Sequence, residues 1–338
     1  MIPERIHPAA GSDWQAALRD TISSAADLLQ LLGLSAAEVG LSEQACADFP
    51  LKVPRGFAAR MRKGDPKDPL LLQVMANARE LRTAPGYGAD PVGESGDANP
   101  VPGIIHKYHG RVLLITTGGC AVHCRYCFRR HFPYDGQQNS RQEWREALRY
   151  IEADGGISEV ILSGGDPLVL TDRHLQELVS QVGAIPHVRR LRIHSRLPVV
   201  IPERVTDGLL DAILHHRLQT VVVVHSNHAN ELDSAVQSAM AAMRVRGITL
   251  LNQAVLLKEI NDDPMTLVAL SERLFAAGVM PYYLHLLDKV QGAAHFDVPE
   301  QHARQLLSEL SARLPGYLVP KLVREEAGAA AKHTLPPL

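Results

Sequence analysis

Three cysteines with metal-ligand spacing, Cys120, Cys124 and Cys127, directly follow a pair of glycines. Thiolates this close can converge on one metal centre if the chain loops around it, and the glycines permit such a turn. A structural zinc site is normally closed by four ligands, whereas an iron–sulfur cubane held by three thiolates leaves one iron open to another ligand. The spacing favours the cubane. A zinc site closed by His123 or a distant histidine, and inert cysteines, are the alternatives.

A second segment with chemical potential is Ser163-Gly164-Gly165-Asp166-Pro167, which comes directly after the next predicted strand. Glycines allow a ligand to approach the backbone closely because they carry no side chain. Such a segment alone is more often a turn than a site. Its place after a cysteine motif and a strand favours a ligand-binding role.

The elements that must position these residues begin near Arg111, where short β-rich runs alternate with helical stretches. This alternation predicts a parallel α/β sheet, and sequential crossovers allow an open barrel, a closed barrel or a doubly wound sheet. The predicted strands are Val112–Thr117, Glu159–Ser163, Arg189–His194, Thr220–His225, Thr249–Leu256 and Tyr282–Leu287.

The chain outside this alternating region divides into two further parts. Leucines and alanines at helical spacing over Trp14–Leu34 begin a mainly helical N-terminal region, residues 1–105. Residues 106–315 form the predicted core, and residues 316–338 form a C-terminal segment. The end of that segment, Ala327–Leu338, is rich in alanine and then proline, a composition typical of an exposed tail.

Composition narrows the class of protein. The chain has 338 residues, with 35 Lys and Arg against 37 Asp and Glu, so its formal net charge is −2. This balance argues against a general nucleic-acid or membrane-surface binder. We see no apolar run long enough for a membrane span and no secretory signal, so we expect a cytoplasmic protein. Four cysteines are too few for a disulfide scaffold and fit a reducing compartment.

The motifs together resemble a known family. The cysteine pattern after the first strand, with an aromatic residue before the third cysteine, is similar to the radical S-adenosylmethionine (SAM) superfamily. Further segments occur in an order that resembles the lysine 2,3-aminomutase family, and closest to the branch that makes β-lysine for modifying translation elongation factor P. These segments are Cys127–Arg130, Ser163–Leu168, Arg196–Val200 and Pro281–Leu284. The resemblance implies a partial (β/α)6 barrel of the radical SAM type.

The resemblance also implies three cofactors. Cys120, Cys124 and Cys127 would hold a [4Fe-4S] cluster, whose open iron binds SAM. Pyridoxal 5′-phosphate (PLP) would form a Schiff base with Lys332, although alanines replace most of the glycines expected before it, and Lys321 is the rival lysine. The residues implied to contact SAM are Gly164, Gly165, Asp166, His225 and Gln253. The residues implied to hold the PLP phosphate are Lys107, Tyr108 and Arg111.

The substrate implied by the resemblance is L-lysine. Arg129 would pair with its α-carboxylate, with Arg130 as the second candidate. Asp288 and Glu325 would pair with the ε-ammonium group, and Glu325 stands where the family has aspartate.

The implied reaction moves the amino group from C2 to C3 and gives β-lysine, which a separate ligase would attach to elongation factor P. We expect a homo-oligomer. An aminomutase for another amino acid, a radical SAM enzyme without PLP and a non-catalytic metal-binding protein remain alternatives.

Overall fold

The computed structural model describes residues 13–134 and 141–338, and a single large sheet dominates it. Its nine strands lie in the order β11-β10-β9-β8-β7-β6-β5-β4-β3. Their bounds are β3 Ile104–Tyr108, β4 Arg111–Thr117, β5 Glu159–Gly164, β6 Arg190–Ser195, β7 Gln219–His225, β8 Thr249–Val255, β9 Met280–His285, β10 Lys321–Arg324 and β11 His333–Thr334.

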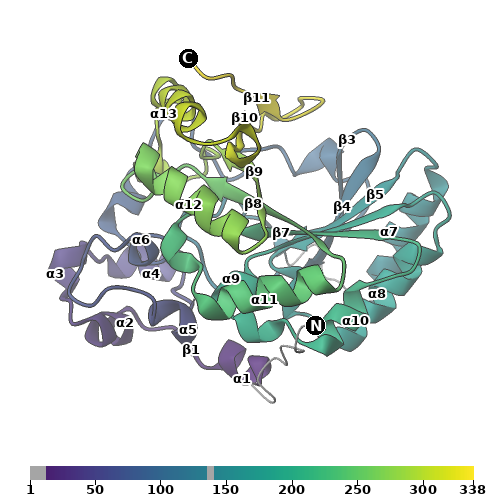
Figure 1. The fold of residues 1–338 in the computed structure, drawn as a ribbon, viewed down its shortest axis with the longest axis horizontal. Helices are drawn as coiled ribbons and strands as arrows, with labels where there is room; N and C mark the ends of the chain where they lie inside the picture. The colour runs from purple at the N-terminus through teal and green to yellow at the C-terminus, as the bar shows by residue number, and fades with distance from the viewer. Residues whose placement is uncertain (1–12, 135–140) are drawn as a thin grey trace, which may run out of the picture.

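Strands β4 to β10 run parallel, and the two edge strands β3 and β11 are antiparallel to their neighbours. The described edges β3 and β11 do not pair with each other, so the barrel is open. Figure 1 shows both edges on the same side of the molecule, at the top of the view. The predicted α/β fold with a partial barrel is therefore confirmed, and β10 adds a seventh parallel strand that periodicity did not reveal.

The predicted strands form because their apolar residues are buried at matching positions. Val112 pairs with Val160 and Leu114 with Leu162 in the β4–β5 register, and all four side chains are at most 1% exposed. In a parallel sheet the carboxyl ends of the strands lie at one edge, which is where loops carry functional residues. The cysteine loop after β4 and the glycine-rich segment after β5 therefore lie together.

Amphipathic helices cover the outer face of the sheet (Figure 1). Side chains of Thr171, Asp233 and Asp263 cap α8, α11 and α12 by accepting bonds from the first-turn backbone N–H groups. The helix bounds are α7 Arg141–Ala153, α8 Asp172–Ala184, α9 Leu197–Val200, α10 Asp207–Ile213, α11 Ser234–Val245, α12 Pro264–Ala276 and α13 Glu300–Arg313.

The N-terminal region is mainly helical, as expected, but its helices are short. The helical spacing over Trp14–Leu34 corresponds to two helices, because α1 ends at Arg19 and Thr21–Ile22 pairs with Val53–Pro54. Buried leucines of this region share one hydrophobic core with the sheet, so the divisions at residues 105 and 315 stay predictions. The helices are α1 Trp14–Arg19, α2 Ala25–Leu32, α3 Ala36–Val39, α4 Glu43–Asp48, α5 Arg55–Ala58 and α6 Pro69–Leu72.

The C-terminal segment is docked, which corrects the expectation of an exposed tail. Strand β11 pairs antiparallel with β10, with Val323 opposite Thr334. Leu335 follows with its side chain 4% exposed, and its N–H donates to the carbonyl of Leu322. Burial of Leu335 and these backbone bonds fix the position of Lys332 just before β11.

A search of the two described ranges finds no helix with the length and apolar character needed to cross a lipid bilayer.

Candidate active site

The cysteine loop follows β4 directly, and hydrogen bonds to the N-terminal region hold it in place. The Lys52 ammonium donates to the carbonyl of Cys120 at 2.8 Å, and the Lys52 carbonyl accepts from the N–H of His123 at 3.0 Å. The carbonyl of Gln73 accepts from the N–H of Arg125 at 2.9 Å. The short helices before the sheet thus hold the loop in shape.

The three thiols of the loop lie near enough to affect one another's pKa. Burial, followed by Asp166 and the other two thiols, raises the pKa of Cys120 well above its ordinary value. Burial and the neighbouring Cys124 likewise raise the pKa of Cys127 to about 11. Thiols crowded in this way ionise readily only when they bind a cation, as metal ligands do.

The number of thiols favours one of the two predicted metal centres. A structural zinc site is normally closed by four ligands, whereas three thiolates can hold a cubane, each on a different iron atom. The donor set of three partly buried thiols therefore fits a [4Fe-4S] cluster better than zinc.

Arg196, which sequence reasoning quoted only as part of a motif, lies against the cysteine loop. Its Nη1 donates to the sulfur of Cys124 at 2.7 Å, and its Nη2 donates to Glu231 at 3.0 Å and to Gln73 at 2.6 Å. Hydrogen bonds to sulfur tune the potential of iron–sulfur clusters. Arg196 therefore helps to hold the loop that carries the thiols, and it would support a cluster bound there.

The glycine-rich segment after β5 packs on the backbone of the cysteine loop. A Cβ atom at Gly164, whose φ is +116°, would lie 2.6 Å from the carbonyl oxygen of Thr117. A Cβ atom at Gly165 would lie 2.4 Å from the carbonyl oxygen of Gly119. Both positions require glycine for this close approach, so the segment sets the position of the loop that carries the thiols.

Asp166 is buried and its carboxylate is already engaged. It accepts from the hydroxyl of Ser195 at 2.7 Å and from the backbone N–H groups of Arg196, Leu197 and Leu168 at 2.8, 2.9 and 3.1 Å. These bonds join the end of β5 to the end of β6. The structure thus gives Asp166 a positioning role, and its contact with SAM stays a prediction.

The predicted PLP residues converge from the two open edges of the sheet. Glu325, just after β10, forms short ion pairs with both Lys107 on β3 and Lys332. All three side chains are largely buried, at 13%, 11% and 22% exposure. Burial alone would raise the pKa of Glu325, but the ammonium groups of Lys332 and Lys107 hold it at about 2.

Tyr108 and Arg111 lie beside this ionic triad. A register shift in the β3–β4 pairing near Tyr108 turns the strand locally, and the Arg111 guanidinium stacks on the Tyr108 ring at 4.7 Å. The Tyr108 hydroxyl is buried and makes no hydrogen bond of regular geometry with the described residues, although burial and the nearby Glu325 carboxylate raise its pKa. A buried hydroxyl donor next to two cations fits a phosphate group, so these residues suit the phosphate of PLP.

Neutral histidines line the interior between the cysteine loop and Lys332. The Nε2 atoms of His194, His225 and His285 are all buried and have no hydrogen-bond partner within residues 13–134 and 141–338. Burial, followed by the charges of Arg196 and Arg129, lowers the pKa of His225 to about 3. Burial and Lys332 lower the pKa of His285 to about 3.

The unpaired ring nitrogens mark an interior surface that can bind a polar ligand. His225 on β7 also lies opposite Gln253 on β8 in the strand register, which brings together two residues predicted to contact SAM.

Arg129 and Asp288, the predicted substrate residues, face the same interior. Arg129 is buried and forms a two-bond ion pair with Glu94 at 2.6 and 2.7 Å. Burial, and then the neighbouring Glu325 carboxylate, raise the pKa of Asp288 to about 7, while Lys332 opposes the shift. Glu94 pairs with Arg129 and also raises the pKa of Asp288, so the structure places Asp288 near both Arg129 and Glu325. It places Arg130 on Glu80 at 3.0 Å instead.

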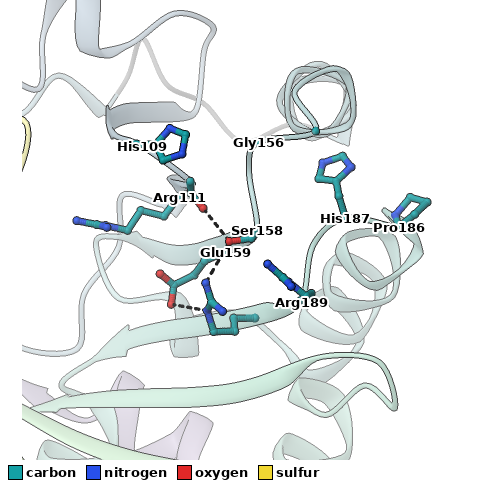
Figure 2. Close-up of a pocket in the computed structure, with 11 residues that line it drawn as sticks. His109, Arg111, Gly156, Ser158, Glu159, Pro186, His187 and Arg189 are labelled. Atoms are coloured by element: carbon teal, nitrogen blue, oxygen red, sulfur yellow. Dashed lines mark hydrogen bonds and ion pairs between the residues drawn. The ribbon is translucent and has the colours of Figure 1, made fainter.

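A cavity of about 590 Å³ opens elsewhere, at the amino-terminal ends of β4, β5 and β6. Figure 2 shows its lining, in which His109, Ser158, Glu159 and Arg189 gather while the side chain of Arg111 runs away from them. The cysteine loop follows the opposite end of β4, about 23 Å along the strand. The cavity is therefore separate from the site of the thiols.

Comparison with known proteins agrees with this geometry. The radical SAM superfamily profile matches residues 114–270. The chain is 51% identical to L-lysine 2,3-aminomutase of Escherichia coli (strain K12) over 96% of this chain and 94% of that protein. The chain belongs to the lysine 2,3-aminomutase family. Within that family it is 49% identical to the Haemophilus influenzae protein, over 95% of this chain and 94% of the relative.

The family also includes a more distant relative from Clostridium subterminale, 31% identical over 98% of this chain and 80% of that protein. As radical SAM enzymes, members of this superfamily use a [4Fe-4S] cluster and SAM. Cys120, Cys124 and Cys127 fall within the matched residues, and the donor set fits the cluster.

Sequence reasoning missed two acidic residues that pair with arginines of the candidate site. Glu94, which holds Arg129, lies in a segment rich in glycine and proline that offers no periodic signal. Glu231, which holds Arg196, lies in a short turn at Ala229–Glu231. Both are acidic residues with less than a tenth of the side chain exposed. The one hint in the sequence of their position was that a buried acid needs a basic partner, and that partner is distant in the chain.

Proposed function

We propose that this enzyme converts L-lysine into β-lysine by moving the amino group from C2 to C3, with PLP attached to Lys332. The observation that supports the proposal most strongly is the position of Lys332. Its ammonium group lies in the interior, paired with Glu325, beside the residues predicted for the PLP phosphate. An exposed tail lysine would have no such surroundings.

The residues from β3 and β4 would anchor the PLP phosphate. Lys107 and Arg111 would supply two cations, and Tyr108 would supply a buried hydroxyl donor. Lys107 also donates to the carbonyl of Val92 at 2.9 Å, which keeps its ammonium group at the edge of the interior. Anchoring the phosphate would orient the ring relative to Lys332.

The cysteine loop and the strand ends beside it would hold the other two cofactors. Cys120, Cys124 and Cys127 would bind the cluster, and Gly164, Gly165, Asp166, His225 and Gln253 are the residues we propose around SAM. When bound, the cluster with SAM supplies one-electron hydrogen abstraction, and PLP supplies a covalent anchor for the amino group. The neutral histidines would give these groups hydrogen-bond partners in place of water.

Charge would select the substrate. Arg129 would bind the α-carboxylate, and Asp288 with Glu325 would bind the ε-ammonium group. When PLP is bound, Lys107 would turn to its phosphate, so Glu325 would lose one of its two ammonium partners. Its carboxylate then needs a cation, which the lysine side chain provides.

The test is anaerobic incubation of the reconstituted enzyme with L-lysine, SAM and a reductant, followed by product identification by mass spectrometry and NMR. β-Lysine is expected from the wild type and from Lys321→Ala, since Lys321 is exposed, but not from Lys332→Ala. If a β-amino acid forms only when another amino acid is supplied, that amino acid replaces lysine as the proposed substrate. Lysine turnover by Lys332→Ala would favour chemistry without PLP on this lysine.

We propose in addition that a separate ligase attaches the β-lysine to elongation factor P, and that the enzyme works in the cytoplasm as a homo-oligomer. The chain is more similar to the E. coli relative than to the clostridial one, which supports assignment to the branch that makes β-lysine for elongation factor P. Loss of β-lysylated elongation factor P after deletion of the gene, with the ligase intact, would test the link.

A further inference from the structure

Arg129 has almost no free hydrogen-bonding capacity in this structure. Its Nε and Nη2 donate to Glu94, at 2.6 and 2.7 Å. Its Nη1 donates to the Ser163 hydroxyl at 3.0 Å and to the carbonyl of Gly164 at 3.1 Å. A guanidinium has five N–H donors, so about one remains. Arg129 and Glu94 are only 7% and 6% exposed.

A carboxylate ligand therefore cannot bind Arg129 in the usual two-bond manner while Glu94 stays in place. Two parallel bonds need two adjacent N–H groups on one edge of the guanidinium. Glu94 uses the edge formed by Nε and Nη2. On the other edge, both N–H groups of Nη1 are used by Ser163 and Gly164. The carboxylate of Glu94 thus occupies one of the two edges at which an α-carboxylate could bind Arg129.

Glu94 belongs to a segment, Asp90–Ser95, that contacts both β3 and the chain before Lys332; we call it the Glu94 strap. The Asp90 carboxylate accepts from the N–H groups of Glu94 and Ser95, each at 2.9 Å. The carbonyl of Val92 accepts from Lys107 on β3. A Cβ atom at Gly93 would lie 2.9 Å from Cβ of Ala327, in the segment that leads to Lys332.

We propose that Glu94 is a specificity residue that competes with the substrate α-carboxylate for Arg129 and is displaced when that carboxylate binds. The proposal rests on the proposed function, because it takes Arg129 as the carboxylate receptor. A buried guanidinium without a partner is strongly destabilising, so an internal carboxylate holds the site together before substrate arrives. A ligand without an α-carboxylate has no means of replacing Glu94.

The experiment compares Glu94→Gln with wild type, with lysine and lysinamide as probes in isothermal titration calorimetry. The enzyme is reconstituted anaerobically with its cofactors and kept without reductant, so that nothing turns over. The variant keeps the shape of Glu94 but removes its charge, which makes it the weaker competitor. Lysine should bind about tenfold more tightly to the variant, the difference between a charged and a neutral hydrogen-bond partner.

Lysinamide carries no carboxylate, so its dissociation constant should change less than twofold. Asp97→Asn is the matched control, since Asp97 is an exposed acid three residues further along, and it should leave both constants unchanged. If Glu94→Gln does not fold, Glu94→Asp takes its place. The shorter side chain cannot keep both bonds to Arg129, and about threefold tighter lysine binding is expected.

Unchanged or weaker lysine binding by the folded variant would overturn the proposal, because Glu94 would then orient Arg129 instead of competing at it. Equal tightening of lysine and lysinamide would also overturn it. These failures differ from failure of the proposed function. If only the role of Glu94 is wrong, the wild type still binds lysine and converts it. If the proposed function is wrong, the wild type does neither.

Discussion

Neutralising Glu325 should destabilise the cofactor-free protein by an amount that follows from its two ion pairs. Glu325 is 13% exposed and balances the charges of Lys107 and Lys332. Its pKa falls from an ordinary 4.5 to about 2. At roughly 1.4 kcal/mol per pKa unit, this shift corresponds to about 3 kcal/mol of folding stability at pH 7.

The sign of the pH dependence is fixed by the direction of the shift. Because the folded protein lowers the pKa of Glu325, the contribution is complete above pH 4.5 and is lost as the pH falls towards 2. Urea unfolding of Glu325→Gln and wild type at pH 7 should differ by about 3 kcal/mol. The difference should shrink at pH 3.

Glu300→Gln is the matched control for this measurement. Glu300 pairs with Arg324, the neighbour of Glu325, at 2.7 Å, but both side chains are 38% exposed. An exposed pair of this kind contributes about 0–1 kcal/mol. If Glu325→Gln costs no more than Glu300→Gln, the interior ionic triad does not stabilise the fold and the reasoning is refuted.

Three further predictions concern the cofactors and the substrate. Tyr108→Phe should weaken PLP binding roughly ten- to hundredfold, the loss of one hydrogen bond to a charged group; equilibrium dialysis measures it, and unchanged binding would remove Tyr108 from the phosphate site. Arg196→Gln should lower cluster affinity about 10- to 100-fold, seen as iron lost during anaerobic chelation; full retention of iron would show that the bond to Cys124 is dispensable. Because burial raises the pKa of Asp288 to about 7, kcat/KM for lysine should rise as the pH increases through 7 and the carboxylate ionises. Asp288→Asn should lower kcat/KM about thirtyfold or more and flatten this rise; an unchanged pH profile would show that another group titrates.

The sequence revealed those parts of the site that depend on local patterns. Strands such as β4 and β5 carry continuous apolar runs, and the cysteine loop begins where β4 ends. Because the ends of parallel strands share one edge of a sheet, the prediction that the cysteines, the glycine-rich segment and His225 lie together followed directly. These residues were placed without any long-range information.

The parts that sequence reasoning missed depend on contacts between distant segments. The alanine-rich stretch before Lys332 has the composition of a tail, yet β11 docks on β10 and Leu335 becomes buried. Likewise, the glycine and proline around Glu94 predict a loop and give no indication that it reaches Arg129. Short strands and loops of this kind gain their structure from tertiary packing, which local propensity does not report.

The position of PLP attachment tests the central claim most directly. The purified enzyme would be loaded with PLP, reduced with borohydride, digested and sequenced by mass spectrometry. We predict that the phosphopyridoxyl mass lies on Lys332. The same mass on Lys321 or another lysine, or its absence from an enzyme that still makes β-lysine, would contradict the account.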